Sequence, residues 1–202
     1  MQGTNERRSN RDRTEATRRE LIAAARTLFT EKSYAETSTP EIVAAAGVTR
    51  GALYHHFADK RALFRAVVEQ EAEDVATEIE RAFGPDELSA RDALLAGSDA
   101  YFAAMRVPGR TRLLLLDGPA VLGRATLDEI DRRHGNRTLR DALGDMMDSG
   151  AMTRLPIEPL TELLGAAFDR AALAIETGAP AADYRKTLGA LLDGLAGSAS
   201  SA

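Results

Sequence analysis

The sequence predicts an all-α fold, in which a small N-terminal domain of three helices precedes a larger C-terminal helical bundle. Three observations support this prediction. Apolar residues recur at helical spacing along most of the chain, for example from Leu63 to Ile79. Short breaks such as Pro108-Gly109 separate one periodic segment from the next. The stretch from Ser38 to Phe57 predicts two short helices joined by a tight turn.

Each of the three N-terminal helices has its own local signal. The first helix has an apolar stripe formed by Leu21, Ile22, Ala25, Leu28 and Phe29. Ser38 followed by Glu41 predicts a capping box at the start of the second helix, in which each side chain accepts a hydrogen bond from a free backbone N–H. Gly47 stands where a helix readily ends in the left-handed conformation, and Thr49 is placed to cap the third helix.

The outer face of the third helix carries Arg50, Gly51, Tyr54 and His55. An arginine can donate two hydrogen bonds to a guanine edge or bind a phosphate, and a glycine lets two backbones approach closely. A tyrosine offers its ring to thymine methyl groups and its hydroxyl to a phosphate. Lys60 adds a cation at the start of the next helix, where free N–H groups already favour an anion. The candidate DNA-binding residues are Thr39, Pro40, Thr49, Arg50, Gly51, Tyr54, His55, His56 and Lys60.

Over about residues 18–64 the chain resembles the TetR/AcrR family of bacterial transcriptional repressors. The resemblance is carried by the turn Ala46-Gly47-Val48, by the ending Leu53-Tyr54 and His56-Phe57, and by Lys60. Two positions depart from the family pattern. Ser33 stands where glycine is usual, and Pro40 lies in the first turn of the second helix, where its missing N–H loses no partner. The resemblance implies a DNA-binding domain, a ligand-binding domain and a homodimer.

Four regions are expected along the chain. Residues 1–13 are predicted to form a flexible basic arm, 14–60 the helix-turn-helix DNA-binding domain, 61–196 the helical effector-binding and dimerisation domain, and 197–202 a disordered tail. In the third region the Gly and Pro breaks delimit helices at Lys60–Phe83, Asp86–Met105, Leu113–Leu116, Ala120–Ser149, Glu158–Thr177 and Ala181–Leu195. Ala120–Ser149 is expected to be one long or kinked helix, with Gly135-Asn136 as a possible break.

The middle of the chain supplies candidate residues for an apolar ligand cavity between helices, with Asp117, Arg124 or His134 as polar anchors. Aromatic and methionine side chains suit such a cavity, but each of them is individually more often plain core. The candidate ligand-binding residues are Tyr101, Phe102, Met105, Leu113, Leu116, Asp117, Val121, Met146, Met147 and Phe168.

The last two helices are apolar on more than one side, and must therefore be covered on more than one side. In the resembling family this helix pair docks against its twin in a second subunit, and an intramolecular core is the alternative. The candidate dimer residues are Leu160, Leu163, Leu164, Ala167, Ala171, Tyr184, Leu188, Leu191 and Leu192.

Charge and composition agree with this organisation. The chain of 202 residues has a net charge of −5, but residues 1–60 hold ten Lys+Arg and eight Asp+Glu, so the acidity belongs to the remainder. With no cysteine there is no disulfide and no thiolate metal site, and a reducing cytoplasm is the expected location. The longest apolar runs, such as Leu113–Leu116, are too short to span a bilayer, so no membrane partner is expected.

Catalytic constellations are absent from the sequence. It has no cysteine nucleophile, no phosphate-binding glycine loop and no H-E-x-x-H pair, so no catalytic residue, metal or cofactor is expected. His55 and His56 are adjacent and point about 100° apart on a helix, which does not suit a shared metal. The expected function is a ligand-responsive repressor that binds a palindromic operator as a dimer and is released by a small hydrophobic molecule. A constitutive or architectural DNA-binding dimer without an effector is the alternative, and an enzyme or carrier that kept the fold is a third.

Overall fold

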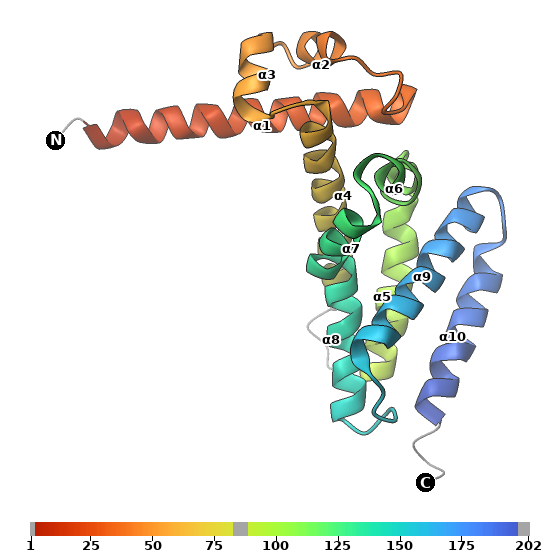
Figure 1. The fold of residues 1–202 in the computed structure, drawn as a ribbon. Coiled ribbons are helices and arrows are strands. Elements are labelled where there is room, and N and C mark those ends of the chain that lie inside the picture. The colour runs from red at the N-terminus through yellow and green to blue at the C-terminus, as the bar shows by residue number, and fades with distance from the viewer. Residues whose placement is uncertain (1–2, 83–88, 198–202) are drawn as a thin grey trace. The chain divides into compact units, whose positions relative to one another are not determined.

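The computed structural model describes residues 3–82 and 89–197, which form ten α-helices and one short π-helix, η1 (Figure 1). The chain divides into two compact units. The first unit contains residues up to 70 together with 112–123, and the second contains residues 71–111 and those from 124 onward. The boundary expected at residue 60 therefore lies within the first unit, which also takes in a later segment of the chain.

The first unit contains the three N-terminal helices, the start of α4, and the segment with η1 and α6. Its core is made of side chains with no solvent exposure, among them Leu21, Phe29, Ile42, Leu53 and Phe64. The rings of Phe29 and Phe64 meet edge to face with centroids 5.1 Å apart. The elements are α1 Gly3–Lys32, α2 Thr39–Ala45, α3 Arg50–His56, α4 Lys60–Ala82, η1 Arg112–Asp117 and α6 Gly118–Leu122.

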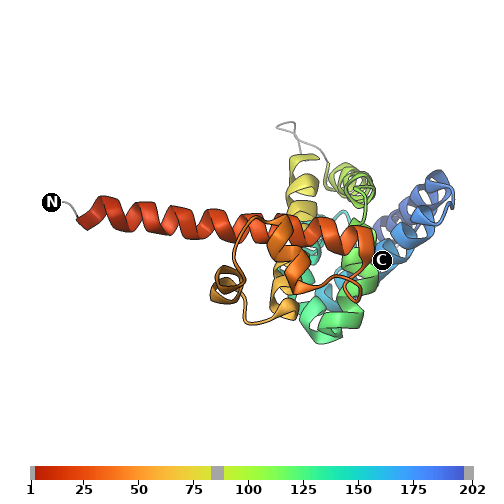
Figure 2. The ribbon, with the colours of Figure 1, turned by 90° about the horizontal axis from the view of Figure 1, so that it is seen from above.

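The basic N-terminal tract is helical from residue 3 onward, whereas the sequence led us to expect a flexible arm over residues 1–13. α1 begins at Gly3 and continues unbroken to Lys32 (Figure 2). The physical reason is that residues 4–32 contain neither glycine nor proline, so nothing in the tract stops the helix. Residues 1–2 of the expected arm lie outside the described residues.

The second unit is a helical bundle with its own apolar core. α8 packs against α5, α7 and α9, while α10 packs against α5. The core is formed by buried side chains of α5, α8, α9 and α10 and of the segment before α9, namely Leu94, Phe102, Leu143, Met146, Met147, Met152, Leu164, Phe168, Ala171, Leu188 and Leu192. The elements of this unit, besides the second part of α4, are α5 Ala90–Met105, α7 Arg124–Arg133, α8 Gly135–Asp148, α9 Ile157–Glu176 and α10 Ala181–Gly197.

Two helix predictions need correction. The long or kinked helix expected over Ala120–Ser149 is three helices. The break between α7 and α8 falls at His134, next to the possible break expected at Gly135-Asn136. The break at Gly123, which adopts a left-handed φ of 82°, was not predicted. The buried short helix expected at Leu113–Leu116 is the π-helix η1, in which Leu113 is buried but Leu116 is 53% exposed. The break expected at Gly84-Pro85 and the tail after Gly197 lie outside the described residues.

A buried arginine that the sequence analysis did not single out joins α4 to the end of α5. The guanidinium of Arg110 donates hydrogen bonds to Glu71, Glu78 and the Ala104 carbonyl, at 3.0, 3.0 and 2.8 Å. Arg110 and Glu71 are almost fully buried. Removing one partner of such a pair leaves a buried charge uncompensated, which costs about 3–5 kcal/mol.

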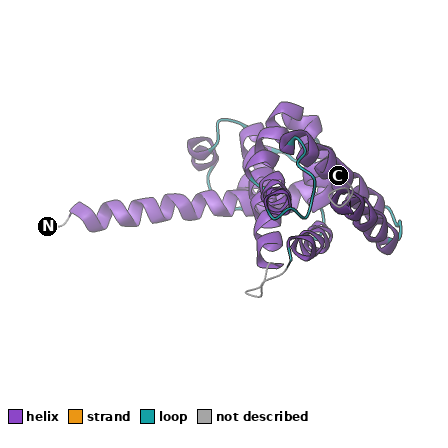
Figure 3. Ribbon diagram, turned by 90° about the horizontal axis from the view of Figure 1, so that it is seen from below, coloured by secondary structure: helices purple, strands orange, loops and turns teal. Residues whose placement is uncertain are grey.

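The described residues contain helices and loops but no β-strand, which confirms the all-α class (Figure 3). None of the helices in the described part of the chain is long and apolar enough to cross a membrane.

Candidate nucleic-acid interface

The second helix begins as the capping box predicts. The Glu41 N–H donates to the Ser38 hydroxyl at 3.4 Å, and the Ser38 N–H donates to the Glu41 carboxylate at 2.8 Å. Lys32 pairs with the same carboxylate, and this ion pair followed by the bonds from Ser38 lowers the pKa of Glu41 to about 2. Glu41 therefore stays ionised at neutral pH and holds the end of α1 beside the start of α2.

The turn between α2 and α3 is also as predicted. Gly47 has a φ of 64°, in the left-handed region that favours glycine. The Thr49 hydroxyl accepts a hydrogen bond from the Ala52 N–H at 3.1 Å and so caps α3. Ile42 and Leu53, one on each helix, are fully buried and fix both helices on the core of the unit.

The opposite face of α3 is open to solvent. Arg50, Gly51, Tyr54 and His55 are exposed, and His56 is half-buried. The Arg50 guanidinium lies 5.5 Å from the centroid of the Tyr54 ring, so the two side chains stack on one surface. A cation and an aromatic hydroxyl thus stand together on an exposed, short, well-capped helix.

The remaining predicted DNA-binding residues lie at the ends of the two helices. Pro40 is exposed and Thr39 half-buried in the first turn of α2. Thr49 is exposed beside Arg50, and its hydroxyl already caps α3. The structure therefore brings Thr49, Arg50, Gly51, Tyr54 and His55 together around α3.

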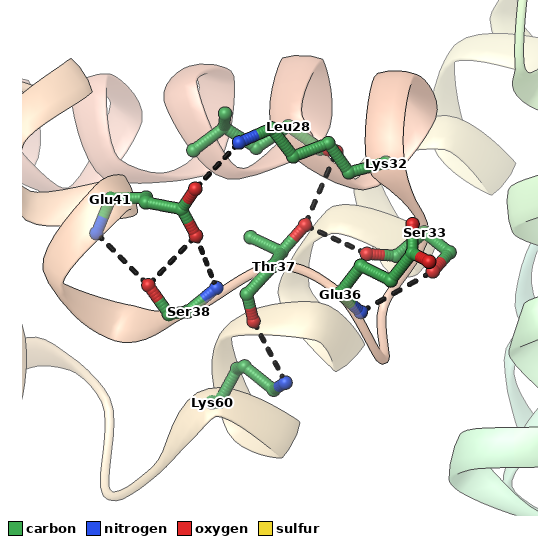
Figure 4. A network of polar contacts seen from close by, with 8 residues as sticks. All are labelled: Leu28, Lys32, Ser33, Glu36, Thr37, Ser38, Glu41 and Lys60. Carbon is green, nitrogen blue, oxygen red and sulfur yellow. Dashed lines mark hydrogen bonds and ion pairs between the residues drawn. The ribbon is translucent and has the colours of Figure 1, made fainter.

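Lys60 does not point away from the protein as a free cation. Its Nζ donates hydrogen bonds to the carbonyls of Tyr34 and Thr37, both at 2.9 Å, and lies 4.1 Å from the centroid of the Tyr34 ring. The Thr37 hydroxyl lies 2.7 Å from the Ser33 carbonyl and 3.2 Å from the Leu28 carbonyl (Figure 4). Lys60 thus belongs to a polar network that joins the end of α1, the turn at residues 33–37 and the start of α4.

The residue after Lys60 makes a second contact within the same unit. Arg61 donates from Nε to the Val121 carbonyl at 3.0 Å and from Nη2 to the Leu122 carbonyl at 2.8 Å. These carbonyls end α6, where a helix has no internal partners for them. The first turn of α4 is therefore tied to both the α1–α2 turn and the end of α6.

The candidate ligand-binding residues are divided between the two units. Leu113, Leu116, Asp117 and Val121 belong to the first unit. The others belong to the second unit, where Tyr101, Phe102 and Phe168 form a ring cluster with centroids 5.7 to 5.9 Å apart. Met146 and Met147 pack in the same core, while Met105 is buried in the last turn of α5 outside that core cluster.

Two carboxylates accompany the ring cluster, and the sequence analysis did not predict their role. The Tyr101 hydroxyl donates to Asp169 Oδ1 at 2.8 Å. Burial, followed by the charge of Asp169, raises the pKa of Asp131 to about 7, and burial raises the pKa of Asp169. The signal for Asp169 was available in the sequence, as the one acid in the otherwise mostly apolar stretch Leu163–Ile175, next to Phe168. Of the three anchors suggested from the sequence, Arg124 is exposed and pairs with Asp128 at 2.8 Å, and Asp117 pairs with Arg112 at 3.4 Å.

The candidate dimer residues fall into two groups. Leu163 on α9 and Leu191 on α10 are 72% and 52% exposed. Leu164, Ala171, Leu188 and Leu192 are buried in the core of their own unit, with Leu160, Ala167 and Tyr184 packed half-buried against it. Leu163 and Leu191 are therefore the candidates with the most side-chain surface left to meet a second subunit.

The capped α2 and α3, with α3 exposing Arg50 and Tyr54, define a helix-turn-helix DNA-binding protein with a helical C-terminal domain. Two family models match this chain. Bacterial regulatory proteins of the tetR family match residues 21–67, and the tetracyclin repressor-like C-terminal domain matches residues 91–197. The chain belongs to the TetR family of bacterial regulatory proteins.

Solved structures agree with this assignment. A TetR-family transcriptional regulator from Pectobacterium atrosepticum is 31% identical with a TM-score of 0.72, and the match covers 92% of this chain and 97% of that one. Reduced NemR from E. coli shares the fold, with a TM-score of 0.70 at 19% identity over 89% of this chain and 97% of that one.

Curated relatives are similar over the N-terminal domain. The regulator AcrR of Shigella flexneri is 42% identical over 62 residues, which is 31% of this chain and 29% of AcrR. The Tn10 TetC protein of Escherichia coli is 45% identical over 56 residues, which is 28% of each. The chain thus covers less than a third of these two relatives. The family and its neighbours are transcriptional regulators and not enzymes, in agreement with the sequence prediction.

The raised pKa of Asp131 predicts how stability depends on pH. The carboxyl has an ordinary pKa of 3.8 and a folded-state pKa of about 7, so its stabilising contribution is complete below pH 3.8 and is lost as the pH rises through 7. We expect Asp131→Asn to raise the melting temperature at pH 8 by a few degrees, since each 1 kcal/mol shifts it by about 2–4 °C. The gain should shrink as the pH falls to 5. Asp145→Asn, at an exposed position of α8, is the control, and equal pH curves for the parent and Asp131→Asn would contradict the prediction.

Proposed function

We propose that this protein is a ligand-responsive transcriptional repressor that binds a palindromic operator as a homodimer in the cytoplasm. The observation that carries the proposal is the exposed face of α3, where Arg50, Tyr54 and His55 stand on a capped helix that is fixed to its core by Leu53. A helix of this kind enters the major groove with its N-terminal residues against the base edges. Arg50 is the first residue of α3 and is placed to contact them.

Dimerisation is supported by the two exposed leucines of α9 and α10. Leu163 is 72% exposed, and covering it with a partner lowers the free energy of association by about 25 cal/mol for each Å² of apolar surface buried. Leu191, on the next helix in the chain, is 52% exposed, and a second copy of this helix pair is proposed to cover both leucines. Two α3 helices in one dimer would read two half-sites about 34–36 Å apart on one face of the duplex.

The second unit is proposed to bind the effector. Its ring cluster of Tyr101, Phe102 and Phe168 suits an apolar or aromatic small molecule, and the hydroxyl and carboxylate of Tyr101 and Asp169 offer polar anchors. A ligand releases DNA only if it binds the non-DNA-binding arrangement more tightly than the DNA-binding one.

A constitutive DNA-binding dimer is the second candidate. It is favoured by one observation: Phe102, Met146 and Met147, expected to line a cavity, are buried as packed core. In that case the second unit serves dimerisation alone, and no small molecule releases the operator.

The contact of Arg50 with base edges predicts a change of specificity. We expect Arg50→Ala to weaken operator binding by about 1–3 kcal/mol and to relax the preference at one or two base pairs, because a forked guanine contact is lost. Fluorescence titrations on the operator and on single-base variants of it measure this. Equal affinity and equal preference for Arg50→Ala and the parent would mean that α3 does not read the sequence.

The exposed leucines predict which substitutions break the dimer without unfolding the chain. Leu163→Glu should yield folded monomers that bind a two-half-site operator weakly, because a charge replaces an apolar contact between subunits. Leu192→Glu should instead destabilise the protein, because Leu192 is buried in its own core. Light scattering with circular dichroism separates the two results. Leu116→Glu, at an exposed leucine outside α9 and α10, is the control, and a monomeric parent protein would remove the premise.

The effector proposal predicts that some apolar or aromatic compound both stabilises the protein and releases the operator. A ligand that binds only the folded state raises its stability by about 2.7 kcal/mol at a hundredfold excess over Kd. A thermal-shift screen followed by operator release tests both effects. Tyr101→Phe should weaken the response to a hit that uses the hydroxyl, while Tyr184→Phe, half-buried beside the same core, should not. Hits that shift the melting temperature without releasing DNA would favour the constitutive dimer.

A further inference from the structure

Arg50 and Tyr54 are neighbours on the exposed face of α3. They lie one helical turn apart, at a spacing that places two side chains on the same side of a helix. The side chain of a helical residue leans toward the N-terminus, so that of Tyr54 leans over the turn that begins with Arg50. The Arg50 Cζ lies over the Tyr54 ring, 5.5 Å from its centroid, which is within the range of a cation–π contact.

The Tyr54 ring is the group that holds the Arg50 guanidinium. Within the part of the chain that the structure describes, the Arg50 side chain makes no ion pair and no hydrogen bond. Leu53, on the preceding side of the turn, is fully buried in the core and leaves the outer face to Arg50 and Tyr54. Arg50 is also the first residue of α3, where the helix dipole disfavours a cation, and no acidic residue of that turn compensates its charge. The direction of Arg50 therefore depends on Tyr54.

A fixed direction matters for an arginine that reads a base. The long side chain has many rotamers, and forming a forked contact with a base edge costs that freedom. A contact that holds the guanidinium before DNA arrives removes part of this cost. The ring takes up none of the five N–H donors of the guanidinium, so all of them remain available to the base.

The hydroxyl of Tyr54 takes no part in this contact. Tyr54 is 43% exposed, and its hydroxyl makes no hydrogen bond with the residues that the structure describes. The hydroxyl can therefore donate to a phosphate while the ring holds Arg50. The two parts of the side chain can be tested separately, because phenylalanine keeps the ring and loses the hydroxyl, whereas leucine loses both.

We propose that Tyr54 is a positioning residue for base recognition: its ring holds the Arg50 guanidinium in the direction from which it reads a base edge. The preference at the base pair that Arg50 reads then depends on an aromatic ring at position 54. This inference rests on the proposed function as a DNA-binding regulator. It is separate from any contact of the Tyr54 hydroxyl with the DNA backbone, which carries no sequence information.

Loss of the ring should lower a preference between base pairs more than it lowers binding in general. A cation–π contact at an exposed site changes an equilibrium by about two- to fivefold. We therefore expect Tyr54→Leu to lower the preference at the pair read by Arg50 by about two- to fivefold for each half-site, and by about the square of that for a dimer on a palindrome. Tyr54→Phe should keep the preference. Any affinity lost with the hydroxyl should be lost equally on preferred and altered duplexes.

The experiment uses duplexes that the protein itself selects. The parent selects its preferred palindrome from a library of random-sequence duplexes, and symmetric base changes in both half-sites show which pair loses its preference in Arg50→Ala. Fluorescence titrations of the parent, Tyr54→Phe and Tyr54→Leu with the preferred duplex and with the duplex altered at that pair give the ratio of the two affinities. Circular dichroism checks the helical content, and Tyr54→Ala replaces Tyr54→Leu if the latter does not fold.

A double-mutant cycle shows whether the ring acts through Arg50. With Arg50→Ala already in place, Tyr54→Leu should leave the affinity ratio unchanged, because no guanidinium remains to be held. The proposal is overturned if Tyr54→Leu keeps the parent's ratio, or if it lowers the ratio equally with and without Arg50, since the ring would then contact the bases on its own. It is equally overturned if Arg50→Ala keeps the preference at every pair.

A measurement without DNA separates this inference from the proposed function. An aromatic ring shifts the NMR resonances of protons that lie over its face upfield. In the free parent protein and in Tyr54→Phe, the δ-methylene protons of Arg50 should therefore be shifted upfield of those of Arg170, which is exposed on α9, and the shift should disappear in Tyr54→Leu. A parent protein that selects no duplex refutes the proposed function, whereas a selected duplex together with an unshifted Arg50 refutes only the positioning role.

Discussion

The DNA-binding unit depends on the stabilisation of two helices that are too short to persist alone. α2 and α3 have seven residues each, below the length at which an isolated helix is stable in water. Each is held by a side-chain cap at its N-terminus, from Ser38 or Thr49, and by one fully buried apolar residue. The caps satisfy backbone donors that would otherwise need water, and the buried residues fix the direction in which the outer faces point.

The two units provide partners for their buried polar groups in different ways. In the first unit charged side chains such as Lys60 and Arg61 satisfy backbone carbonyls at turns and helix ends. In the second unit charged groups are buried among helices, as Arg110 is with Glu71. Buried ions must be paired or neutralised, which explains why Asp131, beside another carboxylate, has a pKa close to 7. The second unit therefore contains a carboxyl group whose protonation near neutral pH affects its stability.

The local structure of the candidate DNA site could be largely predicted because its signals are local. Helix geometry over a few residues predicts the cap from Ser38 and Glu41, the helix end at Gly47, and the face of α3 that lies opposite Leu53. Lys60 is the exception. Its partners Tyr34 and Thr37 are 26 and 23 residues away in sequence, and no local rule predicts that their carbonyls face its ammonium.

The sequence by itself determined the helical class, the caps and the turn of the DNA-binding domain, because these depend on interactions within about four residues. Only the tertiary structure decided that Leu163 is exposed and Leu164 is buried. Consecutive residues on a helix face different directions, and the other helices of the unit determine which of the two is covered. It also decided that a break falls at Gly123 and that Asp169 meets Tyr101. Such contacts join residues far apart in the chain, and their free energies depend on burial that periodicity alone does not specify.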